Sequence, residues 1–166
     1  LASEGLKHVF MISGGGNMHL VDSASRSKKI EYICNHHEQA CAMAAESYGR
    51  ARGNFGVCMV TVGPAATNTL TGLAGAWLDS IPALYISGQV RRDIMITGTK
   101  LRQMGVQEIE IINMAKPITK YAEIVFDSKD IKYHLQKAIF LAKSGRPGPS
   151  FLDIPSDVQA EMVEVS

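Results

Sequence analysis

The chain has 166 residues, a length that favours one domain with a sizeable core over two. Hydrophobic residues make up 46% of the chain, charged residues 20%, and the formal net charge is +1. These values exclude the strongly basic face of a nucleic-acid-binding protein, and no apolar run is long enough to span a bilayer. The three cysteines form no C-x-x-C pair, so we expect mostly buried thiols and a reducing, cytoplasmic location.

Six short apolar runs predict strands, and five helical stretches lie between them. The strands are expected at residues 9–12, 30–34, 56–62, 83–87, 122–125 and 150–154. The helices are expected at residues 18–25, 36–51, 67–78, 109–115 and 129–142. Several strands are continuously apolar, which is typical of parallel strands covered on both faces. The alternation predicts an α/β fold: a parallel central sheet of about six strands with helices on both faces.

The two ends of the chain indicate a domain cut from a longer protein. The opening "LASEGLKHVF" has no Met and predicts the tail of a helix that ends at Gly5. Near the other end, Ser128 is expected to cap the last helix, and "SDVQAEMVEVS" predicts weakly structured, linker-like sequence. We therefore expect one domain over residues 1–158, without its extreme N-terminus, and the start of a linker over residues 159–166.

Glycine-rich turns follow three of the expected strands. They read "SGGGN" at residues 13–17, "GPAATN" at 63–68 and "SGQV" at 87–90. The carboxyl ends of parallel strands share one edge of a sheet, where open α/β sheets bind ligands, so the turns are predicted to form a site together. The first turn lacks the G-x-G-x-x-G spacing of a dinucleotide-binding fold, and no Gly-Lys-Ser/Thr exists to form a P-loop.

Glu38 stands out because an acid opens the apolar stretch "HHEQACAMAA". One interpretation is local: Asn35 caps a helix, and Glu38 is the third residue of a capping box. The other is functional: a carboxyl in an apolar surround can share a proton with a ligand nitrogen. The local pattern favours the cap and leaves both open. A metal site at Cys34, His36 and His37 is disfavoured, because adjacent helical residues point in different directions and no second ligand cluster appears.

Four long segments together resemble the N-terminal, pyrimidine-binding domain of thiamine-diphosphate-dependent enzymes, most closely the acetolactate synthase group. They read "HHEQACAMAAESYGRARG", "VTVGPAATNTLTGLAGAWLDSIPALYISGQV", "QEIEIINMAKPITKYA" and "GRPGPSFLDIPSDVQ". They cover nearly the whole chain, in the family's order. The resemblance implies thiamine diphosphate as cofactor, with its pyrimidine end on this domain. The implied reaction is decarboxylation of a 2-keto acid and carboligation to a second carbonyl compound.

The resemblance also implies roles for individual residues. Glu38 matches the glutamate of the family's "HEQ" segment, which hydrogen-bonds N1′ of the aminopyrimidine ring and activates the cofactor. Gln107 matches the glutamine of an "FQE" segment that faces the reacting centre, so these two are the candidate catalytic residues. The other matches fall in the glycine turn, which includes Gly16, and in the family's "GPGATN" segment. The candidate cofactor-binding residues are Gly14, Gly15, Glu38, Pro64, Thr67 and Asn68.

Two positions depart from the family's pattern. Ala65 replaces a glycine, which narrows the approach to the pyrimidine side. Val106 replaces the aromatic residue that lines the substrate pocket in the acetolactate synthase group. The second departure keeps two alternatives open: another 2-keto acid decarboxylase of the same family, or a non-catalytic domain that kept the fold. Glu38 argues against the latter, because a non-catalytic domain does not need the acid.

The Gly-Asp-Gly segment that binds the diphosphate through Mg²⁺ does not occur in these residues. The resemblance assigns it to a C-terminal domain. We therefore expect the middle and C-terminal domains to be absent from this chain, no metal ligand on it, and no catalysis by the chain alone. The family's site forms between two subunits, which implies a homodimer or homotetramer with an interface around residues 65–79. Whether the intact enzyme also binds FAD stays open.

Overall fold

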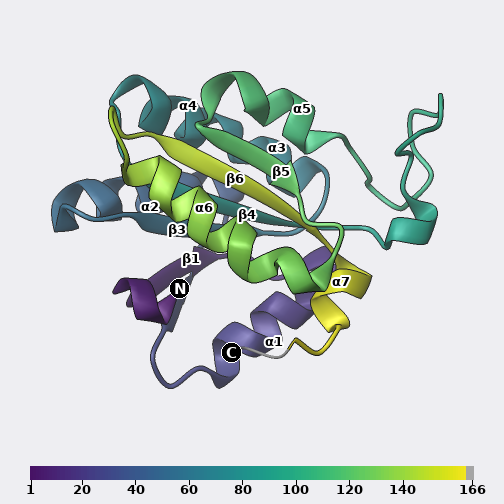
Figure 1. Ribbon diagram of the computed structural model, residues 1–166, viewed down its shortest axis with the longest axis horizontal. Helices are drawn as coiled ribbons and strands as arrows, with labels where there is room; N and C mark the ends of the chain where they lie inside the picture. The colour runs from purple at the N-terminus through teal and green to yellow at the C-terminus, as the bar shows by residue number, and fades with distance from the viewer. Residues whose placement is uncertain (164–166) are drawn as a thin grey trace.

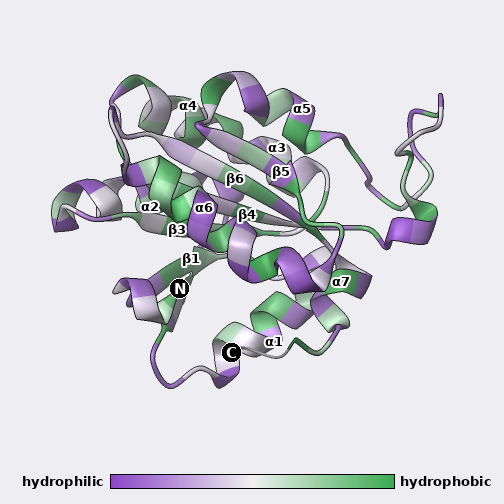
Figure 2. Cartoon of the chain, viewed as in Figure 1, coloured by the Kyte–Doolittle hydropathy of each residue, from purple (hydrophilic) through white to green (hydrophobic). Residues whose placement is uncertain are grey.

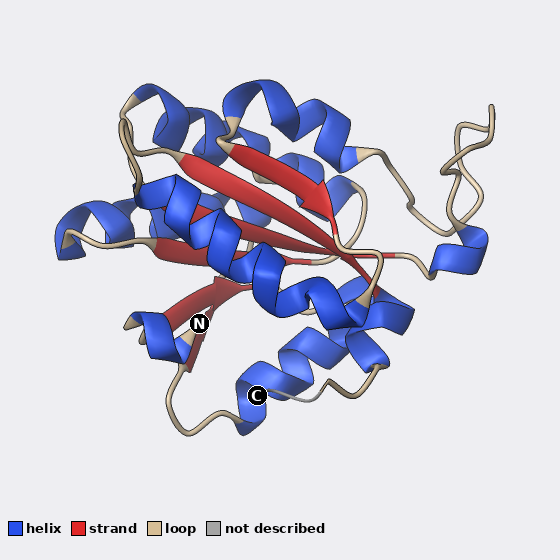
Figure 3. Ribbon diagram, in the orientation of Figure 1, coloured by secondary structure: helices blue, strands red, loops and turns tan. Residues whose placement is uncertain are grey.

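Six strands form one parallel sheet in the order β2-β1-β3-β4-β6-β5 (Figures 1 and 3). The computed structural model describes residues 1–163. The strands are β1 His8–Met11, β2 Glu31–Cys34, β3 Gly56–Val60, β4 Ala83–Gln89, β5 Tyr121–Ile124 and β6 Pro149–Pro155. The helices are α1 Met18–Arg26, α2 Glu38–Arg52, α3 Pro64–Asn68, α4 Leu70–Leu78, α5 Ile111–Ala115, α6 Ile131–Lys143 and α7 Ser156–Ala160. The predicted α/β fold is confirmed.

The central strands are apolar on both faces because helices cover both faces. Along β4, Tyr85 belongs to the hydrophobic cluster on one side of the sheet, while Leu84 and Ile86 belong to the cluster on the other. Figure 2 shows green stretches along the strands, interrupted by purple in β5 and β6, and mixed colours on the helices around the sheet. The edge strand β2 differs, since all four of its residues are exposed.

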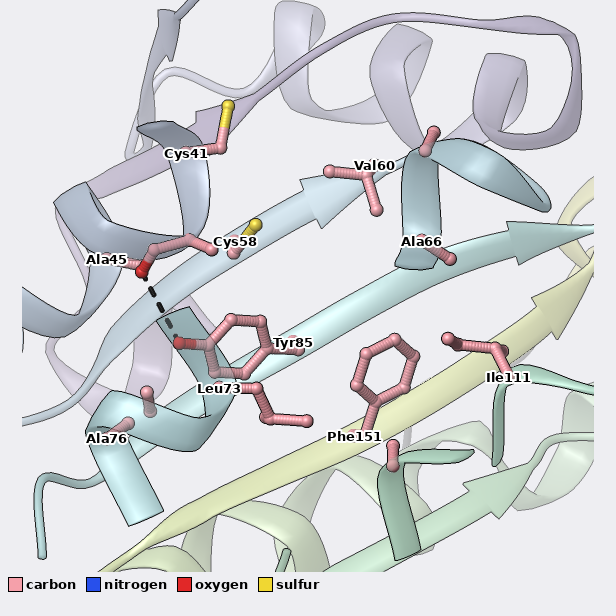
Figure 4. Packing of buried hydrophobic residues seen from close by; sticks show 14 of the residues in the cluster. Cys41, Ala45, Cys58, Val60, Ala66, Leu73, Ala76, Tyr85, Ile111 and Phe151 are labelled. Atoms are coloured by element: carbon pink, nitrogen blue, oxygen red, sulfur yellow. Dashed lines mark hydrogen bonds between the residues drawn. The ribbon is translucent and has the colours of Figure 1, made fainter. Parts of the chain in front are cut away.

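The core on one face lies between the sheet and helices α2, α3, α4 and α5. Its centre is the stacked pair Tyr85 and Phe151, whose ring centroids are 6.2 Å apart (Figure 4). The Tyr85 hydroxyl donates a hydrogen bond of 3.3 Å to the backbone oxygen of Ala42. Burial raises the pKa of Tyr85 well above its ordinary value, so this hydroxyl stays a donor. Small residues on α2 and α4 bring these helices close to the strands.

Helices α1, α6 and α7 cover the other face of the sheet. Residues 156–160 form α7, although the sequence predicted weakly structured linker there, and the expected domain boundary at residue 158 falls inside this helix. Val158 explains the difference, because it is buried in the cluster that α6 and the strands share. Among residues 1–163, no helix is both long and apolar enough to cross a membrane.

Local turns confirm some expectations and correct others. Gly5 ends a short 3-10 helix with a φ of +81°, as predicted. Asp127, and not Ser128, caps the turn that leads into α6, because its side chain accepts the Lys129 N–H. The helix expected at residues 67–78 starts earlier and is broken at Thr69, whose N–H and hydroxyl both bond to the oxygen of Ala66. A threonine hydroxyl competes for helix carbonyls in this way.

Candidate functional site

The glycine turn after β1 lies against the ends of β3 and β4. The N–H of Gly16 donates to the Thr61 hydroxyl, just after β3, over 2.9 Å. A Cβ atom at Gly88, in β4, would lie 1.9 Å from the oxygen of Gly16, so only glycine allows this approach. The turn after β1 and residues 61–62 after β3 therefore meet at one edge of the sheet. The third predicted turn is wrong, because residues 87–89 are the end of β4.

Two amide side chains that the sequence analysis missed hold this turn in place. Asn17 is fully buried, and its Oδ1 accepts the N–H of Gly14 over 2.8 Å. Its Nδ2 donates to the oxygen of Ile12 over 3.0 Å. From α7, Gln159 Nε2 donates to the oxygen of Gly16 over 2.7 Å. Asn17 had a signal in the sequence, because asparagine directly after glycines is a turn residue. Gln159 had none.

Helix α2 begins at Glu38, and the residue that caps it differs from the sequence prediction. His37 is the N-cap: its backbone is extended and its Nδ1 accepts the N–H of Gln39 over 3.1 Å. Asn35 makes a different contact, because its Oδ1 accepts the Cys41 thiol over 3.4 Å. Glu38 is therefore the first helical residue, and the capping box with Asn35 is wrong. A carboxylate in the first turn is stabilised by the helix dipole.

The Glu38 carboxylate is half-buried and accepts one recorded hydrogen bond. Its donor is Asn68 Nδ2 of α3, at 2.9 Å from Oε2. The pair joins α2 to α3 across thirty residues of sequence, and Asn68 itself is exposed. An ionised carboxylate has about four acceptor positions, so most of the acceptor capacity of Glu38 is left for a ligand.

An apolar wall lies on one side of Glu38. Cys41, Ala42 and Ala45 are fully buried in the core of α2, whereas Ala40 and Met43 are exposed. Burial raises the pKa of Cys41 to about 11, and the nearby Glu38 charge acts in the same direction. The neighbour of Glu38 in this wall is therefore an uncharged thiol and no nucleophile. The predicted burial of Cys41, and of Cys58 in β3, is confirmed.

The "GPAATN" turn reaches Glu38 through Asn68. Gly63 precedes α3 with a φ of +69°, and Pro64 is the exposed first residue of the helix. The Thr67 hydroxyl donates to the Pro64 oxygen over 3.0 Å, so it is turned toward its own helix. Of the three candidates in this turn, only Asn68 contacts Glu38 through a recorded hydrogen bond.

Gln107 lies beside the same turn. A Cβ atom at Gly63 would be 1.8 Å from the Gln107 backbone oxygen, so the two backbones are in direct contact. Gln107 has a φ of +59°, which is unusual for a residue with a side chain, and its side chain is exposed. Glu38 and Gln107, the two candidate catalytic residues, therefore both border α3: one through Asn68 and the other through Gly63.

The largest hollow described on the surface lies away from the candidate site residues. A wide, open hollow of about 740 Å³ lies by the start of β2, at the amino ends of the strands. It is lined by Lys7, His8, Ser25, Ser27, Lys28, Lys29, Ile30, Glu31 and Tyr32. We place the site at the opposite edge, because that is where glycine turns and polar side chains converge. Within residues 1–163, no three His, Cys, Asp or Glu side chains are arranged to hold a metal.

Comparisons with known proteins identify relatives along nearly the whole chain. Residues 1–121 match the family model described as thiamine pyrophosphate enzyme, N-terminal TPP binding domain. The chain is 42% identical over 163 residues to "Acetolactate synthase 2, chloroplastic" of Nicotiana tabacum, covering 98% of this chain and 24% of that protein. It is 41% identical over 161 residues to "Acetolactate synthase" of Arthrospira platensis, covering 95% and 27%. The chain thus spans about a quarter of the length of these relatives.

Proposed function

We infer the function from family membership: this chain belongs to the thiamine pyrophosphate enzymes, as their N-terminal TPP-binding domain. We propose that it holds the aminopyrimidine end of thiamine diphosphate, with Glu38 at ring nitrogen N1′. The longer enzyme would decarboxylate a 2-keto acid and join the remainder to a second carbonyl compound. The observation that carries this proposal is the half-buried Glu38 carboxylate, which has one recorded hydrogen bond and an apolar wall.

The side chains around Glu38 are compatible with the aminopyrimidine ring of thiamine diphosphate. Bound thiamine diphosphate supplies the carbanion chemistry at C2 of its thiazolium ring. Glu38 presents a carboxylate oxygen that can hold a proton shared with a ring nitrogen. Asn68 fixes the orientation of that carboxylate through the 2.9 Å bond to Oε2. Cys41 and Ala42, three and four residues further along α2, are fully buried, and a hydrogen bond made next to such an apolar surround is strengthened.

The other candidate residues would bind the substrate or shape the cofactor site. Gln107 would present its exposed side-chain amide to a substrate oxygen at the reacting centre. Gly14 and Gly15 would let the cofactor approach the backbone of the turn after β1. Pro64 and Thr67 would shape the pyrimidine side of the site without contributing charge. Binding by Gly15 is supported by its open surroundings, since a Cβ atom there would meet nothing within 4 Å.

The features that lie outside this chain are also proposals. We propose that a C-terminal domain holds Mg²⁺ and the diphosphate, and that the enzyme is a homodimer or homotetramer. Exposed Trp77 and Leu78, at 38% and 71%, support an interface near α4. Binding of FAD stays open. A cytoplasmic location stays a prediction, because plant relatives carry "chloroplastic" in their names.

A second candidate function rests on Val106. This residue is 78% exposed beside Gln107, at the position where the resemblance places an aromatic side chain. A smaller side chain there favours a different acceptor carbonyl, or simple decarboxylation by a related 2-keto acid decarboxylase. The names of the relatives favour acetolactate formation. Product analysis with pyruvate as the sole substrate separates the two, and a non-catalytic domain would give no product.

The experiment that tests the proposal is Glu38→Gln in the full-length enzyme. We expect kcat to fall by about 10²- to 10⁴-fold, because an amide cannot share a proton at N1′ as a carboxyl can. Exchange of the C2 proton of bound thiamine diphosphate, followed by NMR, should slow equally. The control is Glu46→Gln, eight residues further along α2, where a mostly buried carboxylate pairs with the exposed Arg50. Near-normal C2 exchange in the Glu38 variant would refute the proposed role.

A further inference from the structure

The segment between β4 and α5 projects from the body of the molecule (right side of Figure 1). Its start is fixed by Arg92, whose Nε lies 2.6 Å from Asp157 of α7 and whose NH2 group lies 2.6 Å from Glu161. A third guanidinium bond, of 2.8 Å, goes to the oxygen of Phe126. The beginning of the projection is therefore anchored to the sheet body.

Its end is held by Glu108, an acid whose three recorded hydrogen bonds all come from backbone N–H groups. Glu108 is 7% exposed, and its Oε1 accepts the N–H of Ile96 over 2.6 Å. Its Oε2 accepts the N–H groups of Met104 and Gly105, over 3.1 and 3.0 Å. One carboxylate thus joins residue 96, on the outward path of the projection, to residues 104–105 on its return path.

The outer part of the projection buries little apolar surface of its own. Leu101, Met104 and Val106 are all exposed, so hydrophobic packing cannot order this part. The inner part is fixed from the sheet, because Gln89 Nε2 donates to the oxygen of Ile109 over 3.1 Å. Met95 packs with Val62 and Val90 below this part, so the three bonds to Glu108 add to an apolar contact at the base and are the polar constraint that joins residue 96 to residues 104–105.

Gln107 depends on this constraint. It precedes Glu108, and its backbone has a φ of +59°, a conformation that is unfavourable for a residue with a side chain and persists only where the surroundings enforce it. Its oxygen is pressed against Gly63, on the side of the candidate site. If the Glu108 bonds are lost, the segment can relax, and the Gln107 side chain loses its direction.

We propose that Glu108 is a positioning residue: its carboxylate closes the loop of residues 96–105 and so fixes Gln107 toward the reacting centre. The consequence for the reaction rests on the proposed function, whereas the closing of the loop does not. Glu108 faces backbone N–H groups of its own segment, so it acts through Gln107 and not on substrate.

The test is Glu108→Gln in the full-length enzyme, measured by hydrogen exchange without cofactor. Glutamine keeps one acceptor oxygen but presents N–H groups to the donors that the other oxygen served. We expect amide exchange in residues 96–105 to accelerate about 10- to 100-fold, the loss expected for bonds to a charged acceptor. The matched control is Glu110→Gln, an exposed acid whose one recorded bond is 3.3 Å, from Asn113. Its exchange should be unchanged.

Activity supplies the second readout. We expect Glu108→Gln to lower kcat/KM about 10- to 100-fold, as a misplaced catalytic group does. Added to Gln107→Ala, it should lower kcat/KM little further, because both changes remove the same positioned side chain. Should the glutamine variant fold poorly, Glu108→Asp keeps the charge with a shorter reach, and we expect an intermediate rate of exchange.

Three results would overturn the proposal. The first is unchanged exchange in residues 96–105 for both Glu108 variants. The second is a full additional loss of kcat/KM when Glu108→Gln is combined with Gln107→Ala. The third is a Gln107→Ala variant with normal kinetics. None of them decides the role of Glu38, which the C2 exchange of the Glu38→Gln variant tests separately.

Discussion

Two glutamates near α3 are held in opposite ways. Glu38, at the start of α2, is half-buried and has one recorded hydrogen bond, from the side chain of Asn68. Glu108, just before α5, is buried and accepts three backbone N–H groups. The first acid retains acceptor capacity toward solvent or a ligand, whereas the second has its capacity largely used by the protein.

Together the two acids give one edge of the sheet both a fixed loop and a carboxylate that can react. A buried carboxylate with satisfied acceptors lowers the free energy of one loop conformation, but it has little left to offer a substrate. A partly exposed carboxylate with one oriented oxygen stabilises little, yet it can exchange a proton. A carboxylate whose acceptor positions are used by the protein therefore indicates a structural role. A carboxylate with free acceptor positions, next to a rigid scaffold, indicates a catalytic or binding role.

The largest effect is expected where the rigid region contacts α3. Gly63→Ala would place a Cβ 1.8 Å from the oxygen of Gln107. Either α3 or the loop must move, and we expect the free energy of unfolding to fall by about 2–4 kcal/mol. Chemical denaturation of the full-length protein measures this loss. The change should also accelerate amide exchange around Gln107.

The control for this prediction is Gly53→Ala, at the end of α2. Gly53 also has a positive φ, of +60°, but a Cβ atom there meets nothing within 4 Å. It should cost only the left-handed backbone strain of about 1–2 kcal/mol. Equal losses at both glycines would mean that the contact between Gly63 and Gln107 does not constrain the loop.

Asp153, in β6, adds a third acid, and this one should make stability depend on pH. Burial raises its pKa from 3.8 to about 7, although Ser87 and Gln89 donate hydrogen bonds to it over 2.5 and 2.8 Å. The folded state then holds a proton that the unfolded chain releases between these values. Its contribution to stability is complete below pH 3.8 and is lost as the pH rises toward 7.

The measurement is urea unfolding from pH 4 to 7, for the unsubstituted protein and for Asp153→Asn. The contribution of Asp153 should be a fall of up to about 1.4 kcal/mol per pH unit, absent from the variant. Asp22→Asn, at an exposed residue paired with Arg26, should leave the slope unchanged. Parallel curves for Asp153→Asn and the unsubstituted protein would show that Asp153 is ionised in the fold across this range.

The fold was predictable because it depends on patterns within short windows. Apolar runs and turn residues predicted the six strands, and the parallel sheet followed from their alternation with helices. The start of α2 was missed because Asn35, His36 and His37 can all cap a helix. Asn35 is drawn away by two contacts, from its N–H to the oxygen of Met11 and from Cys41 to its Oδ1.

Apart from Asn17, the residues that hold the site together were not predictable, since their partners are distant or are backbone groups. Gln159 bonds to Gly16, 143 residues away, and Asp153 bonds to Ser87, 66 residues away. Glu108 bonds to N–H groups, which every residue except proline carries, so no side-chain pattern marks it. Glu38 was found through the resemblance of a long segment, because local pattern alone favoured a cap.

The smallest effect is expected for the single recorded hydrogen bond to the Glu38 carboxylate. Asn68→Ala removes the 2.9 Å bond to Glu38 and leaves both helices intact, because Asn68 is exposed at the end of α3. We expect kcat of the full-length enzyme to fall about 3- to 10-fold, since one hydrogen bond of about 1 kcal/mol orients the carboxylate. The free energy of unfolding should change by less than about 0.5 kcal/mol.

The chain offers a matched pair for this last prediction. Asn113 donates to Glu110 over 3.3 Å, an exposed amide–carboxylate contact away from Glu38. Asn113→Ala should leave both kcat and stability unchanged. A loss of kcat at Asn68 as large as that of Glu38→Gln would mean that Asn68 contacts the cofactor directly. No loss of kcat at all would mean that the cofactor orients Glu38 by itself, and that the hydrogen bond from Asn68 of α3 is not needed.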